Sequence, residues 1–327
     1  MRVAIDAMGG DWAPGEIVRG AVLAAREGTA RELLLVGDEN RIREEMRSVG
    51  YEGEGMRVVP ASQVVDMGEL PVKALRSKPD SSLLKAVQLA ASGDADAVMS
   101  AGNTGAFVAA ATLSMKLLPG VHRAGIAVSF PTYHRTCTLI DVGANVNCRA
   151  EHLLQYGLMA SEFAKCMLGI KEPQVGLLNI GEEGTKGNEL VKKAHKLLAE
   201  SPLNFIGNIE GREVFSGGCD VAVCEGFVGN VVLKVSEGLL EGLYRVVEEA
   251  VANLAERGND EEELLGMLRK RTNYAEFGGA LLLGVDGICI ICHGRSDAAA
   301  VRTAISRAVA FAREQVNRKM VPALSVV

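Results

Sequence analysis

The sequence predicts an α/β fold in which a mainly parallel sheet is covered by helices on both faces, giving three layers. Two observations support this prediction. Short apolar runs alternate with helical patterns along almost all of the 327 residues, as they do when helices connect parallel strands. Segments rich in glycine follow several of the apolar runs, at points where a strand would turn into a helix.

The expected strands are short runs rich in Val, Ile and Leu that end near turn-forming residues. The first begins at Val3, near the start of the sequence. In chain order they cover residues 3–6, 32–36, 57–59, 97–100, 125–129, 136–141, 175–180, 204–207, 221–224 and 287–292. Their short, continuous apolar character is typical of strands that are buried on both faces of a parallel sheet.

The expected helices have apolar residues at three- and four-residue spacing. They cover residues 13–26, 41–48, 81–92, 104–116, 151–168, 189–199, 230–257, 261–270 and 296–316. No repeat of fixed period and no low-complexity linker divides the chain. We therefore expect one domain over residues 1–327, built of two interwoven lobes.

Composition and charge exclude several classes of protein. The formal net charge of −6 argues against a nucleic-acid-binding protein, which usually presents a strongly basic face. The longest charge-free segment, residues 97–115, carries polar residues and two glycines in its middle, so no membrane span is expected. Asp6 stands where a signal peptide would need an apolar residue. We expect a cytoplasmic protein.

Seven cysteines lie scattered through apolar runs, which suits reduced thiols that pack as small hydrophobes. Cys289, Cys292 and His293 spell the C-x-x-C-H pattern of haem attachment, but they lie in a buried-strand run. A redox role for this pair is the other alternative. Cys219 and Cys224 lack the spacing of zinc ligands. We expect buried thiols, with neither a metal nor a cofactor.

Four Gly-Asn pairs stand where apolar runs give way to loops or helices: Gly102-Asn103, Gly187-Asn188, Gly207-Asn208 and Gly229-Asn230. Glycine lets a ligand approach backbone N–H groups, and the asparagine amide can donate to an oxyanion. Because ligands bind at the carboxyl ends of parallel strands, we expect the glycine-rich segments to meet at one rim around a phosphate or a developing oxyanion. Ordinary turns and helix caps are the alternative explanation.

Seven blocks in a fixed order resemble the acyl-acyl-carrier-protein:phosphate acyltransferase family, PlsX. They are residues 5–11, 36–39, 100–106, 139–145, 176–188, 225–230 and 277–294, and together they span nearly the whole chain. The chain departs from the family pattern at Phe277 and Leu281, where the family has Tyr and Pro, and in residues 131–137, which lack a glycine-containing turn.

The resemblance implies an isocitrate/isopropylmalate-dehydrogenase-like fold, related to phosphotransacetylases. It implies transfer of a long acyl chain from acyl carrier protein to inorganic phosphate, which gives acyl phosphate for phospholipid synthesis. It further implies a homodimer in peripheral contact with the membrane surface and with a downstream glycerol-phosphate acyltransferase.

The residues suit this reaction. Phosphate is its own nucleophile, so no Ser or Cys nucleophile is required, and neither a G-x-S-x-G elbow nor a G-x-x-x-x-G-K-[ST] loop is present. The expected phosphate cradle is residues 181–188, where Lys186 supplies positive charge and Asn188 an amide at a helix start. Asn103 and Thr104 are second candidates, with helix capping as an equal alternative.

Asn145 and Asn179, at strand ends, could donate to the thioester oxygen, and His293 could protonate the leaving thiolate or donate a hydrogen bond. The expected catalytic residues are Lys186, Asn188, Asn145, Asn179 and His293; the expected substrate-binding residues are Asp6, Gly9, Gly10, Asp11, Asn103, Thr104, Gly181, Glu182, Gly184, Gly187, Gly226 and Asn230.

The sequence signals for partner-binding surfaces are less specific than those for the site. An acidic carrier protein would need a basic surface, and two clusters could supply it: Arg76 with Lys78, and residues 269–271. The alternative is that both clusters are solvated helix faces. Residues 236–271 read as a protruding helical hairpin with apolar residues at helical spacing, for the membrane interface, a dimer or the core.

Three other functions remain open. A phosphate acetyl- or butyryltransferase would use coenzyme A thioesters, a dehydrogenase would share the architecture, and a scaffold would only bind carrier protein.

Overall fold

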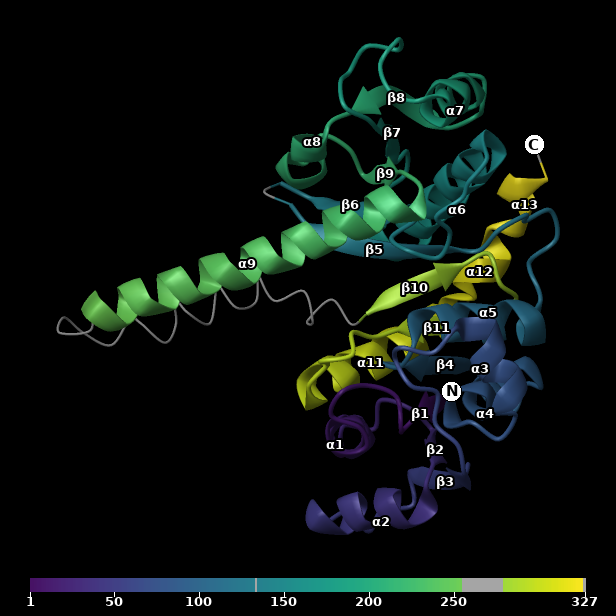
Figure 1. The fold of residues 1–327 in the computed structure, drawn as a ribbon, viewed down its shortest axis with the longest axis vertical. Coiled ribbons are helices and arrows are strands. Elements are labelled where there is room, and N and C mark those ends of the chain that lie inside the picture. Colours follow the sequence, from purple (N-terminus) through teal and green to yellow (C-terminus); the bar gives the residue numbers. More distant parts are fainter. Residues whose placement is uncertain (133, 255–278, 326–327) are drawn as a thin grey trace.

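The structure is a computed structural model that describes residues 1–132, 134–254 and 279–325. One eleven-stranded sheet runs through these residues in the order β3-β2-β1-β4-β11-β10-β5-β6-β9-β7-β8 (Figure 1). The strands are β1 (Arg2–Asp6), β2 (Glu32–Gly37), β3 (Met56–Pro60), β4 (Ala97–Ser100), β5 (Gly125–Pro131), β6 (Thr136–Ile140), β7 (Gln174–Leu178), β8 (Asn204–Ile209), β9 (Val221–Val223), β10 (Ala280–Leu283) and β11 (Cys289–Ile291).

The sheet consists of two parallel groups with opposite strand directions. β3, β2, β1, β4 and β11 form the first parallel group, and β6, β9, β7 and β8 form the second. Between them, β10 is antiparallel to both β11 and β5, and β5 is antiparallel to β6. The two groups occupy the lower and upper halves of Figure 1.

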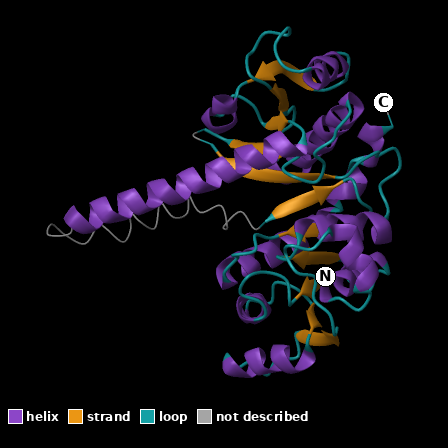
Figure 2. Ribbon diagram, viewed as in Figure 1, coloured by secondary structure: helices purple, strands orange, loops and turns teal. Residues whose placement is uncertain are grey.

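Helices cover both faces of the sheet (Figure 2). They are α1 (Gly15–Arg26), α2 (Glu39–Ser48), α3 (Pro71–Ser77), α4 (Ser82–Ala91), α5 (Thr104–Met115), α6 (Ala150–Leu168), α7 (Glu189–Ala199), α8 (Gly211–Ser216), α9 (Gly226–Leu254), α11 (Ala298–Glu314), α12 (Val316–Lys319) and α13 (Val321–Leu324). Val3 and Ile5 pack into one core with α1, α6 and α11, whereas Ala4 packs into the other with α4 and α5. This alternation confirms the expected three layers.

The ten expected strands are all present. β10 was missed, because four apolar residues between glycines carry no helix or strand period of their own. The helices α3, α8, α12 and α13 were missed because segments of four to seven residues are too short to show a helical period. The expected helix 261–270, the basic residues 269–271 and the second arm of the hairpin lie outside the described residues.

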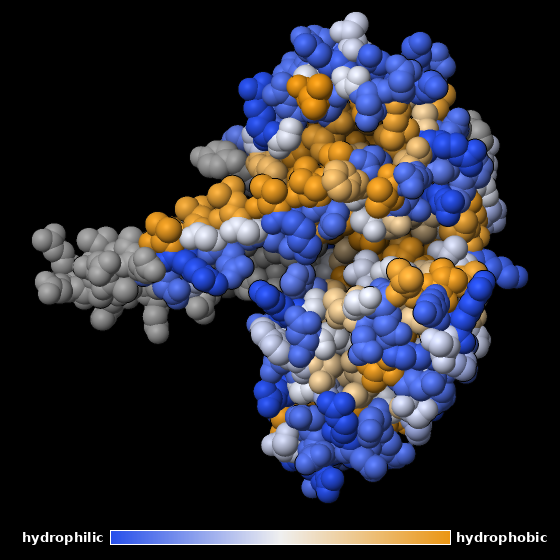
Figure 3. Space-filling view, in the orientation of Figure 1, coloured by the Kyte–Doolittle hydropathy of each residue, from blue (hydrophilic) through white to orange (hydrophobic). Residues whose placement is uncertain are grey.

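α9 is 29 residues long, about 43 Å at 1.5 Å per residue, and projects from the body (Figure 1). It begins at Gly226, four residues before the expected start. A line of exposed apolar side chains runs along it at four- and three-residue spacing: Val231, Val235, Leu239, Leu243 and Val246. We call this line the α9 stripe; it is visible as orange in Figure 3.

Two expectations about composition can be compared with the fold. None of the described helices has the length and apolar character needed to cross a membrane. All seven cysteines are free, and the pair of the haem-like pattern is buried at β11. Burial raises the pKa of Cys292 to about 12, so this thiol stays protonated, as expected for a buried hydrophobe.

Candidate active site

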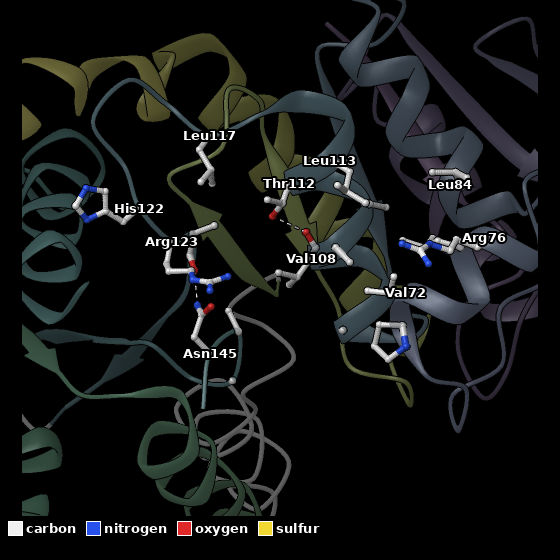
Figure 4. A pocket seen from close by; sticks show the side chains of 18 residues that line it. Val72, Arg76, Leu84, Val108, Thr112, Leu113, Leu117, His122, Arg123 and Asn145 are labelled. Atoms are coloured by element: carbon white, nitrogen blue, oxygen red, sulfur yellow. Dashed lines mark hydrogen bonds between the residues drawn. The ribbon is translucent and has the colours of Figure 1, made fainter. Parts of the chain in front are cut away.

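A cavity of about 650 Å³ lies between the two parallel groups of strands (Figure 4). Its walls come from α3, α4 and α5, and from two segments that lead into β5 and out of β6. The lining residues are Pro71, Val72, Leu75, Arg76, Leu84, Gly105, Val108, Ala109, Ala110, Thr112, Leu113, Leu117, His122, Arg123, Ala124, Gly143, Ala144 and Asn145.

The cavity combines an apolar wall with cationic groups. Leu75, Val108 and Leu117 are among the residues that make its wall suitable for a hydrocarbon chain. Arg123 lies beside Asn145, and Arg76 lies on the opposite side (Figure 4). No carboxylate is among the 18 lining residues, so an anion entering the cavity meets only positive or neutral groups.

The N-terminus of α5 borders the cavity at Gly105. Asn103 caps this helix, because its Oδ1 accepts from the backbone N–H of Ala106 at 2.9 Å. Its amide nitrogen lies 3.0–3.1 Å from the carbonyls of Asp66, Met67 and Glu69. The structure therefore corrects the expected phosphate contact of Asn103, since its donors are used inside the protein. Thr104, half-buried at the first helical position, remains beside the positive end of the helix dipole.

The loop after β6 is held by the buried carboxylate of Asp141. It accepts backbone N–H groups from Ile126 and from Gly143, Ala144 and Asn145 at 2.8–3.1 Å. Burial raises the pKa of Asp141, while these bonds favour its charged form. The loop segment 143–145 is thereby fixed in the cavity wall.

Asn145 lines the cavity, but its amide is engaged. Its Nδ2 donates to the carbonyl of Ala124 at 2.6 Å and to the hydroxyl of Tyr156 at 2.9 Å. Both amide hydrogens are used by these bonds. In this geometry neither amide hydrogen is left for a thioester oxygen, so the role expected of Asn145 in catalysis stays a prediction.

The start of α9 packs against the same loop, the one that follows β6. The N–H of Gly226 donates to the carbonyl of Asn145 at 2.8 Å. A Cβ at Gly229 would lie 1.9 Å from the carbonyl oxygen of Asp141, so only glycine allows this approach. Asn230 is exposed and lies against Gly143, 3.7 Å from where a Cβ of that glycine would be.

A second set of expected residues gathers at the ends of β1, β4 and β11. Buried Asp6 accepts from Ser100 Oγ at 2.7 Å, and burial raises its pKa. A Cβ at Gly9 would lie 2.5 Å from Asp6 Oδ2, and a Cβ at Gly10 would lie 3.1 Å from the carbonyl oxygen of Gly294. The N–H of Asp11 donates to the carbonyl of Gly294 at 2.8 Å.

His293 belongs to this second set and is exposed. Its Nδ1 accepts from the N–H of Arg295 at 3.1 Å. The neutral ring therefore carries its proton on Nε2, which can donate.

The third set is the loop between β7 and α7. Asn188 caps α7 by accepting from Val191 N–H at 2.9 Å, which leaves its amide hydrogens available. Asn179 donates to the carbonyl of Lys186 at 3.2 Å and holds the loop closed. The side chain of Lys186 is exposed. Gly187 has φ +90°, a conformation that favours glycine.

This loop contacts β8, at the edge of the sheet, and α8. The carbonyl of Glu183 accepts from Asn208 on β8, and Glu182 pairs with Arg212 of α8 at 3.5 Å. Gly181 is buried beneath the loop and Gly184 is exposed. None of the contacts described for residues 179–188 reaches a residue that lines the cavity.

The expected meeting of all glycine-rich segments at one rim needs correction. The segments after β4 and β6 both reach the cavity, at Gly105 and at Gly143 to Asn145, whereas none of its lining residues comes from the segments after β1, β7, β9 and β11. The direction of the strands also reverses at β10 and β5, so the carboxyl ends of the two parallel groups do not share one edge of the sheet, and residue patterns along the chain do not reveal this.

Of the two basic residues at the C-terminal end of α3, Arg76 and Lys78, one is engaged within the protein. Lys78 Nζ donates to the carbonyl of Val64 at 2.6 Å and pairs with Asp66 and Glu69, and its pKa is raised chiefly by the bond to Glu69. Only Arg76 of the pair is left for a ligand or partner. Sequence reasoning missed Arg123 and His122, two basic residues directly before an expected strand.

The chain matches the family model described as "Fatty acid synthesis protein" over residues 1–319. It is 48% identical over 323 residues to the phosphate acyltransferase of Pelotomaculum thermopropionicum, covering 98% of this chain and 93% of the relative. It is 45% identical over 327 residues to that of Desulforamulus reducens, covering 99% and 96%.

Solved structures show the same fold. A phosphotransacetylase from Streptococcus pyogenes matches with a TM-score of 0.66 at 17% identity, over 96% of this chain and 94% of that one. A branched-chain phosphotransacylase from Enterococcus faecalis matches with a TM-score of 0.55 at 16% identity, over 97% and 99%. A 4-hydroxythreonine-4-phosphate dehydrogenase from Klebsiella pneumoniae gives 0.51 at 12% identity, over 94% and 98%.

Proposed function

The chain belongs to the fatty acid synthesis protein family whose curated relatives are phosphate acyltransferases, and we propose that it transfers a long-chain acyl group from an acyl carrier protein thioester to inorganic phosphate. The product is acyl phosphate, which would supply phospholipid synthesis through a glycerol-phosphate acyltransferase. The enzyme class, an acyltransferase, follows from the family; the carrier and the chain length are our proposal.

The cavity carries this proposal. Its volume of about 650 Å³ lies within the roughly 300–1,000 Å³ of typical ligand pockets, and an acetyl group would leave most of it empty. Its apolar wall suits a fatty acyl chain, and Arg123 at one side suits an anion.

In the proposed reaction, a phosphate oxygen attacks the thioester carbonyl, the new C–O bond forms, and the C–S bond breaks. The phosphate loses a proton and the thiolate leaving group gains one, so the step balances without a further reactant. Arg123 would orient phosphate, and the first N–H groups of α5, beside Gly105, would stabilise the developing oxyanion.

The remaining site residues expected from the sequence are alternative candidates for roles in the proposed reaction. Lys186 and Asn188 form a second candidate cradle for phosphate, since both present donors to solvent. His293 Nε2 is the candidate donor to the leaving thiolate. The glycines of the three loops would allow close approach of the substrates.

The main alternative is a phosphate acetyl- or butyryltransferase that uses coenzyme A thioesters. The deciding experiment supplies phosphate with palmitoyl or acetyl thioesters of carrier protein and of coenzyme A, and measures acyl phosphate. We expect the palmitoyl carrier-protein thioester to give the highest kcat/KM. Preference for acetyl coenzyme A would establish the alternative instead, and the absence of acyl phosphate from every donor would remove the acyltransferase assignment.

We propose two further associations. The α9 stripe is an exposed apolar surface that a second copy of the chain could cover in a homodimer. The same projecting helix would give a cytoplasmic enzyme its peripheral contact with the membrane surface.

A further inference from the structure

A second hollow lies on the exposed side of α3, beside the cavity. It has a volume of about 740 Å³, and its lining residues are Leu70, Pro71, Val72, Lys73, Arg76 and Ser77. Pro71, Val72 and Arg76 also line the cavity, so this stretch of α3 is a rim that the hollow and the cavity share (Figure 4). A molecule bound in the hollow therefore lies directly next to the cavity.

Two apolar side chains of the hollow are exposed to solvent. Leu70 is 71% exposed and Val72 is 50% exposed. Leu70 occupies the N-cap position of α3, where its side chain makes no capping hydrogen bond. Ser, Thr, Asp or Asn would stabilise the helix at this position, so leucine gives up local stability without being buried in exchange. Such a side chain gains free energy when a partner covers it.

Two cationic side chains flank these apolar residues. Lys73 and Arg76 are both exposed, and no carboxylate lines the hollow. Asp66 and Glu69, in the loop before α3, pair with Lys78 instead. Within the described part of the chain, neither Lys73 nor Arg76 forms an ion pair, so both charges are available to an acidic partner.

The loop that presents Leu70 is held in place before any partner binds. Asn103 Nδ2 lies 3.0–3.1 Å from the carbonyls of residues 66, 67 and 69. Lys78 Nζ donates to the carbonyl of Val64 at 2.6 Å and ties the end of α3 to the same segment. A surface that is already fixed loses little conformational entropy on binding, which favours its use as a docking site.

We propose that Leu70, Val72, Lys73 and Arg76 form the docking surface for the acidic acyl carrier protein that delivers the acyl chain; we call it the α3 surface. Carboxylates of the carrier pair with Lys73 and Arg76, and an apolar side chain of the carrier covers Leu70 and Val72. The thioester arm then crosses the shared rim into the cavity. The proposal rests on the proposed function, because it takes the carrier thioester as the acyl donor.

Position and charge favour a carrier protein over other occupants of this surface. An acyl donor must bring its chain to the cavity, and the α3 surface borders it. The net charge of −6 repels acidic proteins overall, so an acidic partner needs a local basic surface. A second copy of the chain, in a symmetric contact, would bring the same cations against each other. A membrane would need a larger apolar area than Leu70 and Val72 present.

The test compares acyl donors with and without a carrier protein. Palmitoyl thioesters of a bacterial acyl carrier protein and of pantetheine, which is uncharged, each supply the full chain together with phosphate. Lys73→Glu and Leu70→Ser are the variants, because these residues line the hollow but not the cavity. Serine suits an N-cap, so Leu70→Ser leaves α3 intact. Lys73→Arg keeps the charge. Lys171→Glu, at an exposed lysine before β7, is the matched control, since it changes the net charge equally.

We expect Lys73→Glu and Leu70→Ser each to raise KM for the palmitoyl carrier protein about tenfold, with kcat and the KM for phosphate unchanged. The effect of Lys73→Glu should shrink in roughly 1 M salt, which screens charges beyond about 3 Å. Neither variant should change kcat/KM for palmitoyl pantetheine. Lys73→Arg and Lys171→Glu should behave as wild type with both donors.

A wild-type KM for the palmitoyl carrier protein in both Lys73→Glu and Leu70→Ser would overturn the proposal. An equal loss with palmitoyl pantetheine would also overturn it, because the two residues would then act on the cavity. Loss of liposome flotation in the variants, with unchanged carrier kinetics, would assign the surface to a membrane instead.

Binding of the palmitoyl carrier protein to the full chain is measured separately by calorimetry. Acyl phosphate formation from the carrier thioester that depends on neither Lys73 nor Leu70 would keep the proposed function and lose the α3 surface. Carrier binding that weakens in Lys73→Glu, in a protein that makes no acyl phosphate from any donor, would keep the surface and lose the function.

Discussion

Asp141 and Asn145 fix each other four residues apart, at opposite ends of a cavity-lining loop. Asp141 Oδ2 accepts the backbone N–H of Asn145 at 2.8 Å, while the Asn145 amide reaches past it to Ala124 and Tyr156. The loop is therefore tied at once to β6, to the start of β5 and to α6. This arrangement predicts that Asn145 positions the loop, and the prediction has measurable consequences.

Asn145→Ala should destabilise the fold by about 1–3 kcal/mol, since it removes two hydrogen bonds worth about 0.5–1.5 kcal/mol each. It should lower kcat more than it changes KM for phosphate, because the loop at Gly143 loses its fixed position. Tyr156→Phe removes only the acceptor of one of these bonds and should give a smaller loss of the same kind. Urea unfolding and steady-state kinetics measure both effects.

A direct role of Asn145 as oxyanion donor makes a different prediction. Its removal would then lower kcat by about a hundred- to a thousandfold without loss of stability, and Tyr156→Phe would be neutral. That pattern would return Asn145 to the catalytic group.

Arg123 and Lys186 represent the two candidate phosphate sites, and substitution separates them. Arg123→Ala should raise KM for phosphate about ten- to a hundredfold through the loss of a charge-assisted bond. Lys186→Ala should have little effect, because its loop faces β8 and α8.

Arg76→Ala is the matched control, since this arginine also lines the cavity but lies on the other side from Asn145 (Figure 4). The opposite result, with phosphate saturation impaired in Lys186→Ala or Asn188→Ala and intact in Arg123→Ala, would establish the β7–α7 loop as the cradle.

Ala109 offers a way to shorten the acyl part of the cavity. It lines the cavity from α5 and is half-buried, so Ala109→Phe fills space without entering the core. Each methylene that is no longer buried loses about 0.8 kcal/mol, so kcat/KM should fall steeply for palmitoyl donors and little for decanoyl donors. Leu113→Ala, which widens the same wall, should not shift the preference toward shorter chains. Equal losses for both donors in Ala109→Phe would place the chain elsewhere.

The strands were predictable from sequence because buried runs such as Glu32–Gly37 carry a strong local signal. The site was less predictable from the sequence. The site residues predicted from sequence follow the carboxyl ends of strands, but Arg123 precedes β5. It reaches Asn145 because β5 and β6 are antiparallel, with Ala127 opposite Ile140, so the start of one strand meets the end of the other. Strand direction depends on pairing across the sheet, which residue patterns along the chain do not encode.

Helix capping and ligand binding could not be distinguished from the sequence at two asparagines. Asn103 and Asn188 both cap helices, as the alternative explanation allowed, and the sequence could not tell which of them keeps a free amide. The difference lies in the carbonyls of residues 66–69, which come from a distant segment and use the donors of Asn103.

The α9 stripe should mediate self-association. Val235 and Leu239 are 63% and 69% exposed, and large apolar groups in a continuous line gain free energy when a partner covers them. Val235→Glu with Leu239→Glu should convert a dimer into a monomer in light scattering, with unchanged helix content by circular dichroism. Glu241→Gln, on the same helix, is the control. A dimeric mass retained by the double variant would argue against this surface, and liposome flotation of the same proteins tests the membrane contact.

His152 should make the stability of the fold depend on pH. Its lowered pKa means that the folded protein binds this proton less tightly than the unfolded chain, whose value is near 6.5. Stability is therefore present above pH 6.5 and is lost as the pH falls through the lowered folded-state value. Asp6 and Asp141 act in the opposite direction, because their raised pKa values favour the folded state at low pH. The difference between wild type and His152→Gln cancels their contribution, since it is common to both proteins. Urea unfolding between pH 5 and 7.5 should show a shallower loss of stability on acidification in the variant. Equal pH dependence in the two proteins would mean that the ring is not held in its neutral form.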